Sequence, residues 1–174
     1  MATEEKREAK NRIAYTVMIV RDFGDAHHLT PRQAHNYLRR HKAMDYLDEF
    51  YDVEHTLSPA DTLESLDIIS KRNGGQPPSG PSACSRRWKS SPYKNDTTMR
   101  EPETKEQKFL IDCIIADLAF YLMEDEGMTV NDALGTVYDS EYYNLLNNLD
   151  TGLYLRGSLN NYHYLRRELD YGKP

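Results

Sequence analysis

Apolar side chains recur every three or four residues along two long stretches of the chain, the spacing of helices with one buried face. The first stretch runs through residues 13–69 and the second through residues 110–169. The second opens with Leu110, Ile111, Ile114, Ile115, Leu118, Ala119 and Leu122. Strict alternation of apolar and polar residues, which marks a strand, is sustained nowhere. The pattern therefore predicts an all-α protein.

Helix start and stop signals divide each stretch into about four helices. Thr30 precedes Pro31 and is followed three residues later by Gln33, which forms a capping box with proline in the first turn. Ser58 before Pro59 repeats the cap-and-proline arrangement. In the second stretch, threonine and serine precede the predicted helices, and a glycine follows the long first one. Each stretch is thus predicted to form a small helical lobe.

Between the two lobes, residues 73–106 lack apolar periodicity. Residues 74–82 are rich in Gly, Pro and Ser, which neither hold a helix nor fill a core. A structureless stretch of this length is unusual inside a compact domain but ordinary in a linker. We expect an N-terminal helical lobe at 1–72, a disordered, flexible linker at 73–106 and a C-terminal helical lobe at 107–174.

The two lobes share a residue pattern at a separation of 99 positions. Residues 29–34 (Leu-Thr-Pro-Arg-Gln-Ala) align with residues 128–133 (Met-Thr-Val-Asn-Asp-Ala), and Leu38 falls on Val137. Two explanations remain open: the lobes are distant copies of each other, or any two small helical lobes share such a pattern. A lobe of about 65 residues has little core of its own, so we expect it to pack on the other lobe or on a partner.

The chain has 174 residues and a formal net charge of −6, which is concentrated in the C-terminal lobe. Residues 1–72 carry −2, residues 73–106 carry +2 and residues 107–174 carry −6. This acidity argues against a dedicated nucleic-acid coat. No run reaches the roughly 18 apolar residues that a membrane span needs, and no hydrophobic leader follows Met1. We therefore expect a cytoplasmic protein with no membrane partner.

Few residues suggest chemistry. The two cysteines make no disulfide framework, and the six histidines lack the spacing on one helix face that zinc sites use. Cys113 lies among isoleucines, so we expect it to be a small core residue. The sequence shows no combination of a nucleophile, a general base and a phosphate-binding loop. We therefore expect that the chain is not an enzyme and binds no cofactor or metal.

Two basic groups are candidates for nucleic-acid contact. The linker group is Arg86, Arg87, Trp88 and Lys89. Interleaved basic and aromatic residues can follow a phosphate backbone and stack bases, or fold onto an acidic protein, although a solubilising linker explains them as well. The second group, Arg39 and Arg40, makes the Thr30 helix basic, as in a helix-turn-helix reader, although a solvated charged face also fits.

Tyrosine is unusually abundant, with 13 residues against one Trp and four Phe. Many of the tyrosines lie near acidic residues in the second lobe. Tyrosine is amphipathic and common at interfaces, so an acidic, tyrosine-bearing face could enter a basic cleft of a partner. The alternative is that tyrosines fill the small helical cores. We expect both roles to occur.

Short motifs add a resemblance. Asp45-Tyr46-Leu47 and residues 51–56 (Tyr-Asp-Val-Glu-His-Thr) follow the Thr30 helix, and in these the first lobe resembles a family of short bacterial proteins of unknown function. The second lobe carries residues 126–129 (Glu-Gly-Met-Thr), 132–134 (Asp-Ala-Leu) and 151–154 (Thr-Gly-Leu-Tyr). In these it resembles another small helical family from the same gene neighbourhoods. Those neighbourhoods often include a gene for an ADP-ribosyltransferase-like toxin, so the resemblance implies two antitoxin-like modules fused in one chain. No catalytic residue carries over from either family.

We therefore expect an antitoxin-like protein that binds a co-encoded cognate toxin and neutralises it by occluding its active site. The expected contact or lobe-shaping residues are Tyr46, Tyr51 and His55 in the first lobe, and Leu153 and Tyr154 in the second. Two alternatives remain: a DNA-binding regulator of its own operon, and a non-catalytic scaffold. The sequence leaves the oligomeric state open.

Overall fold

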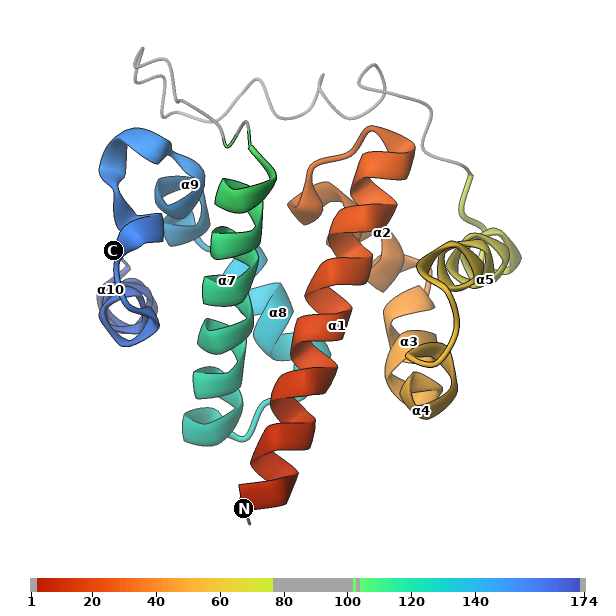
Figure 1. The fold of residues 1–174 in the computed structure, drawn as a ribbon, viewed down its shortest axis with the longest axis horizontal. Helices are drawn as coiled ribbons and strands as arrows, with labels where there is room; N and C mark the ends of the chain where they lie inside the picture. The colour runs from red at the N-terminus through yellow and green to blue at the C-terminus, as the bar shows by residue number, and fades with distance from the viewer. Residues whose placement is uncertain (1–2, 77–101, 103, 173–174) are drawn as a thin grey trace. The chain divides into compact units, whose positions relative to one another are not determined.

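The computed structural model describes residues 3–76, 102 and 104–172. Within these residues the elements are α-helices and two short 3-10 helices, with no strand, which confirms the predicted all-α class (Figure 1). The chain divides into two compact helical units. Unit 1 contains residues 1–18 and 99–174, and unit 2 contains residues 19–98.

Unit 2 holds the end of α1 (Thr3–His27), then α2 (Pro31–Arg40), α3 (Ala43–Glu49), α4 (Tyr51–Glu54) and α5 (Pro59–Arg72) (Figure 1). Helix α3 packs against both α2 and α5. The fully buried side chains of this core include Phe23, Leu38, Met44, Leu47 and Leu66. The apolar positions that predicted the helices are therefore the ones that fill the core.

The predicted caps start these helices. Thr30 Oγ1 accepts a hydrogen bond from the Gln33 backbone N–H at 3.3 Å, and Gln33 Oε1 accepts one from the Thr30 N–H at 2.9 Å. Ser58 Oγ accepts from the Asp61 N–H at 3.3 Å at the start of α5. Each bond satisfies a backbone donor that has no partner inside its helix.

Unit 1 contains α7 (Lys105–Glu126), α8 (Val130–Asp139), α9 (Glu141–Asn147), the 3-10 helices η1 (Leu149–Thr151) and η2 (Leu153–Leu155), and α10 (Ser158–Tyr171). Helices α8 and α10 pack against α7, and α9 packs against α8, α10 and η2. Gly127 ends α7 with a φ of +66°, a left-handed conformation that glycine adopts without strain. Thr129 Oγ1 caps α8 by accepting from the Asp132 N–H at 3.2 Å.

The first part of α1 belongs to unit 1. Lys6 Nζ lies 2.6 Å from a carboxylate oxygen of Glu124, and Lys10 Nζ lies 3.7 Å from one of Asp117. The Lys10 ammonium also lies 4.7 Å from the centre of the Phe120 ring. The sequence expectation placed residues 1–18 with the N-terminal lobe, because helical periodicity shows that a face is buried but not which core buries it.

Within the described parts of the chain, no helix is long and apolar enough to cross a membrane.

Candidate partner-binding site

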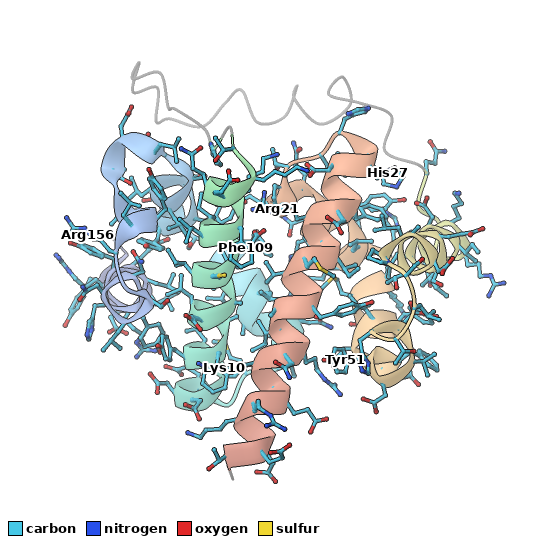
Figure 2. All side chains as sticks on the ribbon, viewed as in Figure 1. Lys10, Arg21, His27, Tyr51, Phe109 and Arg156 are labelled. Atoms are coloured by element: carbon cyan, nitrogen blue, oxygen red, sulfur yellow. The ribbon has the colours of Figure 1, made fainter. Side chains whose placement is uncertain are left out.

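The predicted partner-binding residues fall in corresponding segments of the two units. We define the unit-2 connector as residues 46–60, which lead from α3 to the start of α5. The unit-1 connector is residues 145–159, which lead from α9 to the start of α10. Tyr46, Tyr51 and His55 lie in the unit-2 connector, and Leu153 and Tyr154 lie in the unit-1 connector. Figure 2 labels Tyr51 and Arg156, which mark the two connectors.

In the unit-2 connector the three predicted residues are held by short-range contacts. The Tyr46 hydroxyl donates a 2.7 Å hydrogen bond to Oε1 of Glu54, a carboxylate that is only 2% exposed. This bond, then burial and the negative charge of Glu54, raise the pKa of Tyr46. The Tyr51 ring stacks on the His55 ring with centroids 4.7 Å apart, and His55 Nδ1 lies 2.6 Å from the Tyr51 carbonyl oxygen.

Burial separates these residues into two kinds. Tyr51 and Leu153 are buried and pack inside their units, so they shape the connectors from within. Tyr46 and Tyr154 are half-buried and His55 is exposed, so these three keep part of their side chains at the surface. Contact with a partner remains a prediction for all five.

The unit-1 connector is anchored by Asn161 of α10, which sequence reasoning missed. This side chain is fully buried, and its Oδ1 accepts a 2.5 Å hydrogen bond from the Tyr142 hydroxyl. Its Nδ2 lies 3.2 Å from the carbonyl oxygen of Leu153, 3.0 Å from that of Arg156 and 3.3 Å from that of Gly157. The signal in the sequence is that Asn161 lies four residues before Leu165, on the predicted apolar face of that helix.

The outer side of each connector carries large apolar side chains. In unit 2, Phe50, Val53 and Leu57 are 43%, 57% and 41% exposed. In unit 1, Leu145, Leu155 and Leu159 are 39%, 71% and 58% exposed. Such side chains gain free energy when another molecule removes them from water. The connectors are therefore the candidate binding surfaces of the described chain.

The second-lobe tyrosines divide between the core and the surface. Four of the eight are buried: Tyr138, Tyr142, Tyr143 and Tyr162. Burial raises the pKa of Tyr142, and burial together with a 2.6 Å hydrogen bond to Asp125 raises that of Tyr162. The open alternative, that tyrosines fill the core, is correct for these four.

Cys113 is exposed, so the expectation of a core cysteine was wrong. Its neighbours Ile111, Ile114 and Ile115 are buried and occupy the inward side of α7. Cys113 therefore lies outside the buried stripe of the helix, although it is surrounded by apolar residues in sequence.

The remaining candidate residues are the two basic groups and the histidines. Arg39 and Arg40 are exposed in the last turn of α2. The basic linker residues Arg86, Arg87, Trp88 and Lys89 lie outside the described residues. His27 Nε2 lies 3.2 Å from a carboxylate oxygen of Asp67. Among the residues that the structure describes, no group of three His, Cys, Asp or Glu is placed to hold a metal ion.

Comparison with known proteins gives one family match. Residues 14–73 match the model of a family described as a protein of unknown function, DUF3791. No curated protein matches the chain, and no solved structure does. The match agrees with the resemblance of the first lobe to a family of unknown function. The helical segment that contains Tyr46, Tyr51 and His55 is therefore similar to this family.

Proposed function

We propose that this chain is an antitoxin-like protein, which binds a toxin encoded beside it and neutralises the toxin by covering its active site. The observation that carries the proposal is the set of large apolar side chains exposed on the two connectors. The most exposed of them are Leu155 at 71% and Leu159 at 58% in the unit-1 connector, and Val53 at 57% in the unit-2 connector. Such side chains gain free energy when a partner removes them from water.

Charge favours a basic partner. The unit-2 connector has Asp48, Glu49 and Asp52 half-buried or exposed and no Lys or Arg, while Glu54 is buried. The whole chain carries a formal net charge of −6. Complementary charge speeds the encounter of two proteins and disfavours partners of the same sign.

The proposed mechanism is competition for the active site. Two binding surfaces carried by one chain strengthen each other, because binding of the first raises the effective concentration of the second. The resemblance to antitoxin-like families suggests an ADP-ribosyltransferase-like toxin. For such a toxin the excluded ligand is NAD or the acceptor that it modifies.

A growth assay tests the proposal. The gene adjacent to the one for this chain is expressed alone and together with the tagged chain, and the tagged chain is then purified. We expect growth arrest with the neighbour alone, recovery on co-expression and a stable complex of the two proteins. Absence of toxicity, or recovery without a complex, would contradict a direct-binding antitoxin.

The second candidate function is regulation of its own operon by DNA binding. It is favoured by the exposed pair Arg39 and Arg40 at the end of α2, since cations placed in this way can contact phosphates. The test is binding of the purified chain to its own promoter at increasing salt. Salt-sensitive binding that is lost in the Arg39→Ala/Arg40→Ala variant would support this role, and binding by neither form would exclude it.

A further inference from the structure

We infer that the chain carries one binding module twice, and that the connector of each copy is a docking surface for a basic protein partner. The inference deepens the proposed function and rests on it for the partner. It requires that the two units correspond element by element, and that the connector exposes large apolar side chains in both of them.

The helix boundaries of the two units correspond without an insertion. Helix α2 spans 31–40 and α8 spans 130–139, while α5 spans 59–72 and α10 spans 158–171. Each pair is separated by 99 positions, as are the ends of α1 and α7 at residues 27 and 126. Helices α3 and α9 have the same length of 7 residues and differ from this register by one position.

The turn before the second helix is the same in both copies. His28 and Gly127 both adopt positive φ, at +55° and +66°, and they occupy equivalent positions. Two residues later, Thr30 and Thr129 each cap the next helix through the hydroxyl oxygen. Positive φ is uncommon for a residue other than glycine, so its occurrence at His28 indicates a backbone shape fixed by the fold.

The buried positions also correspond. Every buried residue of α2 and α3, and two on α5, has a buried counterpart 99 positions later. The unit-2 residues are Ala34, His35, Leu38, Ala43, Met44, Leu47, Thr62 and Leu66. Their unit-1 counterparts are Ala133, Leu134, Val137, Tyr142, Tyr143, Leu146, Asn161 and Leu165.

A tertiary hydrogen bond is repeated as well. Thr62 Oγ1 of α5 donates to the Glu54 carbonyl oxygen at 3.4 Å. Asn161 Nδ2 of α10 donates to the Leu153 carbonyl oxygen at 3.2 Å. Both bonds join equivalent positions, so α5 and α10 hold their connectors at the same point. Chance similarity of two helical lobes does not account for this shared anchor.

Both connectors expose large apolar side chains, although these occupy different positions in the two copies. Each has three: Phe50, Val53 and Leu57 in unit 2, and Leu145, Leu155 and Leu159 in unit 1. Within the described residues, the rest of unit 2 has only Ile68 in this class, whereas the rest of unit 1 has Met18, Phe109, Leu110, Leu169 and Tyr171. The unit-2 connector has acidic residues and no Lys or Arg, which favours a partner surface that offers apolar contacts beside Lys or Arg side chains. In the unit-1 connector Asp150 and Arg156 balance, so for that copy the preference for a basic partner rests on the net charge of −6.

Site-specific photocrosslinking in cells that carry the gene and its neighbours tests the inference. A photoreactive phenylalanine analogue replaces Val53 or Leu57 in one copy, and Leu155 or Leu159 in the other. Ile68 and Leu169, at 42% and 43% exposure, are matched controls outside the connectors. We expect one basic protein to be crosslinked from both connectors and from neither control.

Direct binding of the purified captured protein to the full chain completes the test. We expect Val53→Asp and Leu155→Asp each to weaken binding about tenfold, and the double variant to weaken it further. Ile68→Asp and Leu169→Asp should each change it less than about twofold, in the range of near-neutral positions. Circular dichroism of every variant shows that the fold is retained, which is expected since all these side chains lie at the surface.

Several results would overturn the inference. They are equal crosslinking from the controls, crosslinking from one connector only, crosslinks that stay within the chain or join two copies of it, and affinity that the connector variants leave unchanged. The identity of the captured protein tests the proposed function separately. A captured protein that is not toxic contradicts the antitoxin role and leaves the repeated module in place. A neighbouring toxin that binds through other surfaces supports the antitoxin role and contradicts docking at the connectors.

Discussion

Replacement of Asn161 by alanine should destabilise unit 1 strongly, although Asn161 belongs to no apolar cluster. Its side chain is fully buried and links α10 to α9 through Tyr142 and to the connector through three carbonyl oxygens. Alanine removes all of these hydrogen bonds, because its methyl group can neither donate nor accept one.

The size of this loss in stability depends on which of the bonded groups keep another hydrogen-bond partner. The Leu153 carbonyl oxygen also accepts from the Arg156 N–H at 3.0 Å, and the Gly157 carbonyl oxygen from the Asn161 N–H at 3.2 Å. The Tyr142 hydroxyl and the Arg156 carbonyl therefore lose most. A buried polar group without a partner costs about 1–3 kcal/mol, and the part-buried Arg156 carbonyl costs less than the buried Tyr142 hydroxyl, so we expect a loss of about 2–4 kcal/mol for the two together.

Thermal unfolding followed by circular dichroism measures this loss. For a unit of this size, each 1 kcal/mol lowers the Tm by roughly 4–8 °C, so the Tm of unit 1 should fall by at least about 8 °C. Asn160→Ala is the control, because Asn160 is the exposed neighbour on the same helix and its loss should cost less than about 0.5 kcal/mol. Equal Tm values for the two variants would refute the assignment of Asn161 as the anchor of the connector.

Three further predictions concern local structure. His28→Gly should stabilise the chain by about 0.5–1 kcal/mol, because glycine relieves the left-handed φ of +55°; an unchanged or lower denaturation midpoint would count against this. Thr30→Ala and Thr129→Ala should each cost about 1 kcal/mol in urea denaturation through loss of the helix cap, and a cost in only one copy would show that the caps are not equivalent. Stability should fall as the pH rises above about 10, since the unfolded chain then ionises tyrosines that burial and hydrogen bonding keep neutral in the folded chain, with their pKa raised. Tyr162→Phe should make this fall shallower between about pH 9 and pH 11, and an unchanged slope would contradict the raised pKa of Tyr162.

The helical class and its start points could be predicted because they depend on local sequence. The Thr30 capping box and the Ser58 cap involve residues three positions apart, so their hydrogen bonds are visible in the sequence itself. The grouping of residues 1–18 with unit 1 could not be predicted in this way. It depends on contacts such as Lys6 with Glu124, between residues far apart in the chain.

The candidate site was predictable only in outline. The motif resemblance includes residues 51–56 and 151–154, which lie in the two connectors. It did not show that Tyr51 and Leu153 are buried, or that Phe50, Val53 and Leu155 are the exposed apolar residues. A turn of helix fixes spacing along the chain, but which side of a short connecting segment faces water depends on the helices packed beneath it.

The repeat illustrates the same limit. Similar residues at 29–34 and 128–133 suggested a duplication but also fitted two unrelated helical lobes. The correspondence of buried positions and of the Thr62 and Asn161 bonds is visible only in three dimensions. Core positions accept different side chains of suitable size, so two copies can keep a packing pattern after the residues themselves have changed.

The most direct test of the central claim is growth in cells that express the adjacent gene together with the Val53→Asp/Leu155→Asp variant of this chain. The wild-type chain and the matched Ile68→Asp/Leu169→Asp variant serve as controls, with protein levels compared by immunoblot. We predict that both controls restore growth and that the connector variant, present at the same level, does not. Full rescue by the connector variant would contradict neutralisation through the two connectors.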